Sequence, residues 1–264
     1  KTIPLGMSRG SWKDLSLPKN LSYIGNNDKM DQLNYKAKSY WYNRTPSDIT
    51  ITDIYGDRKS STSSTDNQIT VLDLVYDPTL RGAYNKGNSA LDQTEDYKYW
   101  GGFMKPLSSS ANDLVEENIE FIEFWVRIDA AGSGAKLNID LGQISEEVIP
   151  NGKLDTEDGD GNGILASEAD DVGLDGESDI EEGATSDMPD PNNDNFSYNS
   201  GNYVNVNGTD GNKNDTEGGG LLPDTEDLNG NYTLDNVDSY FRYEVPLDTT
   251  KVNGSFTNEF IQGT

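Results

Sequence analysis

A short acidic motif occurs twice in this chain and constrains how its C-terminal half can fold. Residues 155–162 read DTEDGDGN, and residues 224–231, 69 positions later, read DTEDLNGN. Each copy places oxygen-bearing side chains at alternate positions, as the loops that surround calcium do. Asp, Asn and Gly are also ordinary turn residues, so one such run alone could be a solvated turn. Because the spacing is repeated, we expect calcium-binding loops.

The charge of this region also indicates bound cations. Residues 151–238 contain 23 Asp and Glu and only two basic residues, Lys153 and Lys213, which gives −21 of the net charge of −27. Such a segment repels itself and stays disordered unless something neutralises it. An unstructured loop of this length is also unusual inside a compact domain. We therefore expect divalent cations to order residues 151–238.

The spacing of EF-hand calcium loops assigns ligands in both copies, because those loops use positions 1, 3, 5, 7, 9 and 12. The expected ligands of the second copy are Asp227, Asn229, Asn231, the Thr233 carbonyl, Asp235 and Asp238. Those of the first copy are Asp158, Asp160, Asn162, the Ile164 carbonyl, and Glu168 or Asp170. The second copy has Tyr232 at the turn position where Gly is usual, and no amphipathic helix flanks either copy.

Three further groups of oxygen donors lie in the same segment. They are Asp171, Asp175, Asp179, Glu181 and Glu182; Asp190, Asn192 and Asp194; and Asp210, Asn212, Asn214 and Asp215. For each of these groups, a calcium site and a solvated turn are equally good interpretations.

Composition excludes several functions. The chain has no Cys and no His, so it lacks thiolate metal sites, disulfides and catalysis by Ser/His or Cys/His. Its pI near 4.1 argues against nucleic-acid binding, which needs basic residues to contact phosphates. No apolar run is long enough for a helical membrane span, and the first residues lack the apolar core of a signal peptide. Weak calcium loops need roughly millimolar calcium, which points outside the cytosol.

Alternating apolar residues predict an all-β fold. The expected strands cover residues 68–76, 119–128, 136–141 and 241–247, with a weaker strand from Phe256. Long strands joined by irregular loops suggest a jelly-roll β-sandwich. We assign residues 1–150 and 239–264 to this sandwich, which should supply most of the core, and residues 151–238 to an acidic calcium-binding insertion.

Two other functions are weighed against a structural role. Exposed aromatic rings, Trp41 and Trp100 foremost, could form a platform for glycans in a carbohydrate-binding module of jelly-roll type, although aromatic residues at strand spacing are more often core residues. A glycosidase would need two carboxylates roughly 5 to 10 Å apart. Carboxylates are so abundant here that their proximity carries no information, and we expect no enzyme.

Taken in order, many short runs of this chain resemble the SprA (also called Sov) family, the large outer-membrane translocon of type IX secretion and gliding motility. The runs are SWKDLSLP (11–18), YKAKSYWY (35–42), VLDL (71–74), RGAYN (81–85), WGGFM (100–104), NIEFIEFW (118–125), LNIDLGQISE (137–146), DVGLDG (171–176), DPNNDNF (190–196), TEG (216–218) and PDTEDLN (223–229). The resemblance implies a surface-exposed, non-catalytic portion of such a protein. It further implies a structural and protein-interaction role at the extracellular face of the outer membrane, with other parts of the translocon as partners.

Overall fold

The computed structural model describes residues 5–19, 21–44, 49–56, 68–87, 91–107, 114, 116, 118–120, 122, 125–129, 134–158, 161–164, 172–198, 202–209, 223–247 and 257–263. Strands predominate over short helices in this part of the chain. The strands are β1 (Lys13–Asp14), β2 (Ala37–Asn43), β3 (Leu72–Arg81), β4 (Phe103–Met104), β5 (Lys136–Gln143), β6 (Asp238–Pro246) and β7 (Thr257–Gly263). The helices are α1 (Lys29–Leu33), α2 (Ile51–Tyr55) and the 3-10 turns η1 (Arg9–Ser11), η2 (Ser22–Ile24) and η4 (Gln93–Lys98).

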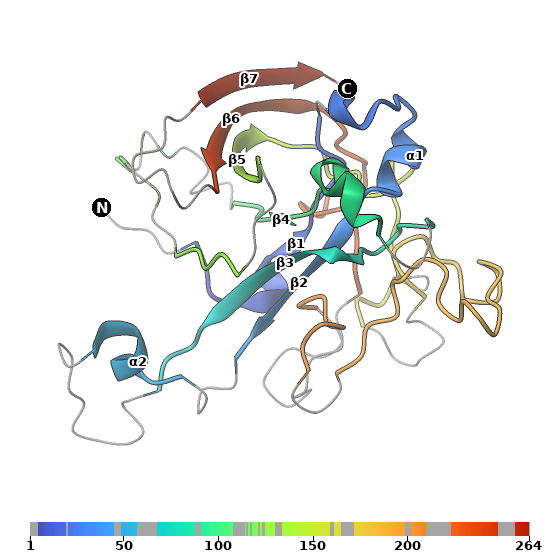
Figure 1. The fold of residues 1–264 in the computed structure, drawn as a ribbon, viewed down its shortest axis with the longest axis horizontal. Coiled ribbons are helices and arrows are strands. Elements are labelled where there is room, and N and C mark those ends of the chain that lie inside the picture. Colours follow the sequence, from blue (N-terminus) through green and yellow to red (C-terminus); the bar gives the residue numbers. More distant parts are fainter. Residues whose placement is uncertain are drawn as a thin grey trace.

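Within the described residues the strands form small antiparallel sheets: β1 with β4, β2 with β3, and β5–β6–β7 in that order. The β2–β3 ribbon crosses the molecule and carries α2 beyond one end, while β5, β6 and β7 lie on another side (Figure 1). The chain is therefore β-rich, as its sequence predicts.

The β2–β3 ribbon buries one large aromatic residue. In β2, Trp41 pairs with Leu74 of β3, and its indole N–H donates to the Arg9 carbonyl at 3.0 Å. The register shifts between Ala37 and Lys38, where the β3 partner changes from Arg81 to Asp77. This irregularity lengthens β3 at its C-terminal end and brings Arg81 toward the acidic segment.

The three-stranded sheet is held by a buried ion pair as well as by its backbone hydrogen bonds. Arg242 of β6 lies opposite Asp140 of β5 and donates to both of its carboxylate oxygens, at 2.8 and 2.7 Å. Such bidentate pairs fix the register of the strands and also stabilise the sheet. The strands predicted at 136–141, at 241–247 and from Phe256 onward correspond to β5, β6 and β7, which confirms these three predictions.

Two strand predictions need correction. The strand expected at 68–76 begins at Leu72 and continues to Arg81. Of the strand expected at 119–128, residues 119, 120, 122 and 125–128 are described and none is in a strand, while Trp125 is 91% exposed. Phe121, Glu123 and Phe124 lie outside the described residues. Alternation of apolar residues is not enough for a strand, because a neighbouring strand must also supply the hydrogen-bonding partners.

The core lies beside the sheets and reaches into the acidic segment. One cluster of buried apolar residues contains Leu21, Ile24, Leu33, Ala83, Tyr84, Trp100, Val148, Ile149 and Leu174. Phe196 packs against this cluster, so the insertion contributes to the core as well as the flanking regions. None of the helices in the described part of the chain has both the length and the apolar character that a membrane span requires.

Candidate metal centre

The two copies of the acidic motif pair with each other. Thr156 and Thr225 form an antiparallel bridge, in which the Glu157 N–H donates to the Asp224 carbonyl and the Glu226 N–H to the Asp155 carbonyl, both at 3.0 Å. The sequence predicts two calcium loops, and the structure pairs the residues that lead into them.

The glutamate of each motif is buried and binds backbone. Glu157 Oε2 accepts the Asp224 N–H at 2.6 Å. Glu226 Oε1 accepts the N–H groups of Val148 and Ile149 at 2.7 and 2.9 Å, and its Oε2 accepts the Asp155 N–H at 3.0 Å. These glutamates therefore join the motifs to each other and to the core, a role that sequence spacing did not reveal.

Each loop wraps around its first aspartate in the same way. Asp158 accepts the N–H groups of Asn162 and Gly163, both at 2.9 Å. Asp227 accepts those of Asn231 and Tyr232 at 3.0 and 2.8 Å. Gly163 and Tyr232 both have positive φ, 74° and 61°. Tyr232 thus adopts the left-handed turn for which Gly is the usual residue.

In the second loop a carboxylate from outside the motif comes near the predicted ligands. The amides of Asn229 and Asn231 both donate to Asp235 Oδ2, at 2.7 and 3.1 Å. Glu146 accepts the Asn229 amide at 3.3 Å and the Asp235 N–H at 3.4 Å. Burial raises the pKa of Glu146. Glu146 is far from the second loop in the sequence, so the spacing of residues within the loop does not predict this contact.

The prediction that Asp238 is the ligand at position 12 needs correction. It begins β6, where its Oδ1 accepts the Ser145 N–H at 2.8 Å. Its Oδ2 forms an ion pair with the Lys19 ammonium at 3.3 Å, without the geometry of a hydrogen bond. The chain has already entered the strand at this point, so the carboxylate faces those partners. Glu146 is the carboxylate that contacts the second loop instead.

A third group of acidic residues converges from the segment 175–194. The carboxylates of Asp175, Glu182 and Asp194 offer oxygens that lie within 4.8 Å of one another, and so do those of Asp179, Glu182 and Asp190. We call these five residues, together with Asn192, the Glu182 cluster. The sequence predicted its members in two separate groups, and the structure unites them. These acidic groups could hold a metal ion.

Several oxygens of this cluster are buried without a hydrogen-bond donor. They are Glu182 Oε1, Asn192 Oδ1 and Asp194 Oδ2. Asn192 is 0% exposed and Asp194 is 3% exposed. The Asn192 amide nitrogen donates to Asp175, which directs the carboxamide into the cluster. A buried polar atom with no partner is costly, and a buried charge more so, unless a cation neutralises it.

The electrostatics of the cluster agree with this geometry. Burial first, and then the neighbouring carboxylates, raise the pKa of Asp194 to about 9. Burial likewise raises the pKa of Glu182 to about 7 and raises that of Asp175. The positive charge that the protein places near the cluster therefore does not offset the burial of Asp194.

The end of β3 holds the cluster in place. The Arg81 guanidinium donates to the carbonyls of Asp190 and Pro191, at 2.9 and 2.6 Å. The Tyr84 N–H donates to the Asn192 carbonyl at 2.6 Å, and the Tyr84 hydroxyl accepts the Leu174 N–H at 2.9 Å. Residues near both ends of the segment 175–194 are thus tied to the end of β3 and to Tyr84, which follows it.

The remaining predicted ligands are only partly described. Asn162 and Thr233 lie in their loops as expected, and the Ile164 side chain is exposed. The predicted ligands outside the described residues are Asp160, Glu168, Asp170 and Asp171, as are the further donors Asp210, Asn212, Asn214 and Asp215.

The glycan-stacking prediction needs correction, because both tryptophans are core residues. Trp41 is 1% exposed and Trp100 is 6% exposed, with its indole donating to the Gln32 carbonyl at 3.1 Å. Burial removes the flat face on which a sugar would stack.

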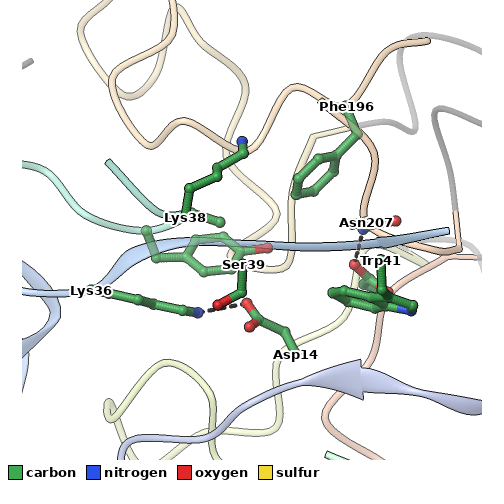
Figure 2. Close-up of a pocket in the computed structure, with 10 residues that line it drawn as sticks. Asp14, Lys36, Lys38, Ser39, Trp41, Phe196 and Asn207 are labelled. Carbon is green, nitrogen blue, oxygen red and sulfur yellow. Dashed lines mark hydrogen bonds and ion pairs between the residues drawn. The ribbon is translucent and has the colours of Figure 1, made fainter. Parts of the chain in front are cut away.

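Trp41 lines a small cavity beside β2 that has both polar and apolar side chains around it (Figure 2). The Lys36 ammonium and the Asp14 carboxylate face each other there at 2.5 Å, and the Asn207 amide donates to Asp224 at 2.5 Å. Asp224 also accepts the Thr209 hydroxyl at 2.8 Å. Asp224 also lies 4.0 Å from the Lys13 ammonium of β1, which ties the acidic segment to that strand.

No family model, no curated protein and no solved structure matches this chain. The case for a metal centre therefore rests on the geometry of its own residues.

Proposed function

We propose that this chain is a non-catalytic domain whose acidic segment is ordered by bound calcium. The observation that carries the proposal is the Glu182 cluster, where carboxylate and amide oxygens are buried without donors. A cation placed among them supplies the missing partner and offsets the cost of burying the charges.

The donor set favours calcium over other metals. Oxygen is the only kind of ligand atom in the cluster and in both loops, and the chain has no Cys or His. Hard cations prefer oxygen. Calcium accepts six to eight oxygens in flexible geometry, whereas magnesium demands an octahedron and keeps several waters. Irregular loops with several carboxylates suit calcium better.

In the second loop the Asn229 amide can serve with or without the cation. It donates to Asp235 Oδ2 through nitrogen at 2.7 Å. Rotated by half a turn about its terminal bond, it presents oxygen to an ion held by Asp227 and Asp235. The Asn231 amide keeps its orientation, because its Oδ1 accepts the Thr233 N–H at 2.8 Å.

The larger role we propose is a cell-surface portion of a SprA-like outer-membrane translocon, with the jelly-roll sandwich as its overall form. The ordered runs shared with that family support this role, and a calcium requirement suits an extracellular location. The partners are then other parts of the translocon. The buried Trp41 and Trp100 do not favour a carbohydrate-binding module.

Counting the ions tests the calcium proposal. The chain is dialysed to equilibrium against buffer that contains roughly millimolar calcium, and its calcium is counted by elemental analysis and native mass spectrometry. We expect more calcium in the protein solution than in the surrounding buffer, and a strong chelator should remove this excess. Protein free of calcium after loading, or loaded equally well by magnesium in its place, would refute the proposal.

The surface location has its own test in the bacterium that encodes the chain. Brief protease treatment of intact cells should release peptides from residues 151–238, and deletion of the encoding segment should reduce type IX secretion. Peptides released only after lysis would contradict the surface assignment and leave calcium binding untouched.

A further inference from the structure

We propose that the Glu182 carboxylate bridges two calcium ions, an inner ion with Asp175 and Asp194 and an outer ion with Asp179 and Asp190. This inference rests on the proposed function and deepens it, because it specifies the number of ions in the cluster and the ligand that they share.

Distances within the cluster fit an ion in each group. Calcium lies about 2.3 to 2.6 Å from each oxygen ligand, so two ligands on opposite sides of one ion are about 4.6 to 5.2 Å apart. The three oxygens of each group lie within 4.8 Å of one another, which matches that span. Glu182 belongs to both groups. A carboxylate has two oxygens with several lone pairs, so one side chain can contact two ions.

The unpartnered oxygens point to a ligand independently of the acidic residues. Asn192 is uncharged, is 0% exposed, and leaves Oδ1 without a donor while its nitrogen binds Asp175. Asp194 Oδ2, in the same inner group, also lacks a donor. A turn that merely tolerated acidic residues would expose these oxygens to water. Here they are buried beside Asp175, where a cation completes their bonding.

The charge of the cluster calls for a cation. Five carboxylates converge. The basic side chains that interact with them are Lys38 and Arg81, with Asp190 and Asp194, and Lys86, with Asp175. Arg81 donates its hydrogen bonds to backbone carbonyls of this segment and not to the carboxylates. The number of ions is inferred from the two groups of oxygens, which share only Glu182.

The two ions should differ in accessibility. Asp194 is buried and belongs only to the inner group, whereas Asp179 and Asp190 of the outer group are half-buried. Substitutions can therefore remove one ion or both. Asp194→Ala should remove the inner ion, Asp179→Ala the outer ion, and Glu182→Ala both.

Native mass spectrometry at saturating calcium gives the count directly. If the wild-type chain binds n ions, we expect one fewer in Asp194→Ala, one fewer in Asp179→Ala and two fewer in Glu182→Ala. Asp187→Ala serves as the matched control, because Asp187 is exposed, lies in the same segment and belongs to neither group. It should keep n.

Near-ultraviolet circular dichroism establishes that each variant is folded. If Glu182→Ala does not fold, Glu182→Gln replaces it. The glutamine side chain has one oxygen in place of the two of the carboxylate and carries no charge, so we expect fewer than n ions in this variant. A count of n or of one fewer in Glu182→Ala, or of n in Glu182→Gln, would overturn the bridge. Wild-type protein that binds no calcium would instead refute the proposed function itself.

Discussion

At the scale of single residues, the buried carboxylates of this chain differ in how their oxygens are hydrogen-bonded. Glu226 accepts three backbone N–H groups and joins the repeated motifs to the core. The carboxylates of the Glu182 cluster accept fewer hydrogen bonds, and Glu182 and Asp194 each have a buried oxygen without a donor. The first kind of carboxylate is satisfied by the protein, and we propose that a cation satisfies the second kind.

Glu226 predicts a specific pH dependence. Burial raises its pKa from the ordinary 4.5 to about 7. Because the folded state binds this proton more tightly, the contribution to stability is fully present below about pH 4.5 and is lost as the pH rises through about 7. In excess chelator, the melting temperature of the wild type should fall from pH 5 to pH 8 by more than that of Glu226→Gln, which cannot ionise. Equal falls in both proteins would contradict this assignment.

The close contact between Gly173 and Asp194 predicts that a methyl group added at Gly173 weakens metal binding. A Cβ at this position would lie 2.1 Å from Asp194 Oδ2, and the residue has a φ of 71°. Gly173→Ala should cost roughly 1–3 kcal/mol of stability and weaken calcium binding, as measured by calorimetry. Gly176→Ala is the matched control, because it has a φ of 70° with no atom within 4 Å. Equal calcium affinities in the two variants would argue against Asp194 as a ligand.

At the scale of elements, the C-terminal end of β3 positions the Glu182 cluster. Arg81 spans the carbonyls of Asn85, Asp190 and Pro191 with two of its nitrogens. A lysine has one ammonium on a flexible chain and cannot reproduce these bonds. The end of the strand therefore fixes the backbone of the segment that carries the proposed ligands.

Arg81→Lys should consequently lower calcium affinity by about 10- to 100-fold, the usual effect of disturbing residues that orient metal ligands. Competition with a chromophoric chelator measures this change. Arg127→Lys provides the control, because Arg127 is exposed and pairs with Asp129 on the surface. A wild-type affinity in Arg81→Lys would mean that the cluster holds its shape without β3.

Sequence patterns predicted the elements whose signals are local. The alternation in β5 and β6 and the matched loops around Asp158 and Asp227 follow from neighbouring residues. Contacts between distant segments could not be predicted in this way. Glu146 meets Asn229 only in the folded chain, and Glu182 meets Asp194 in a segment whose backbone Arg81 of β3 binds. The sequence likewise did not distinguish Trp41 and Trp100, which the fold buries, from aromatic residues that stay exposed.

At the scale of the whole molecule, a strongly negative segment packs against a small apolar core. Leu174 and Phe196 bring this segment into the core, while its net charge of −21 opposes compaction. We propose that bound cations reconcile the two, because cations would neutralise charge where acidic side chains converge. Without them, the segment should loosen and take its part of the core with it.

A thermal melt with and without calcium, at matched ionic strength, tests this claim most directly. Each site should add about 2.7 kcal/mol when free calcium is 100-fold above its dissociation constant. We predict a clearly higher melting temperature with calcium than with chelator, and no such gain from added sodium chloride. The same melting temperature in calcium and in chelator would contradict the proposal that cations order this chain.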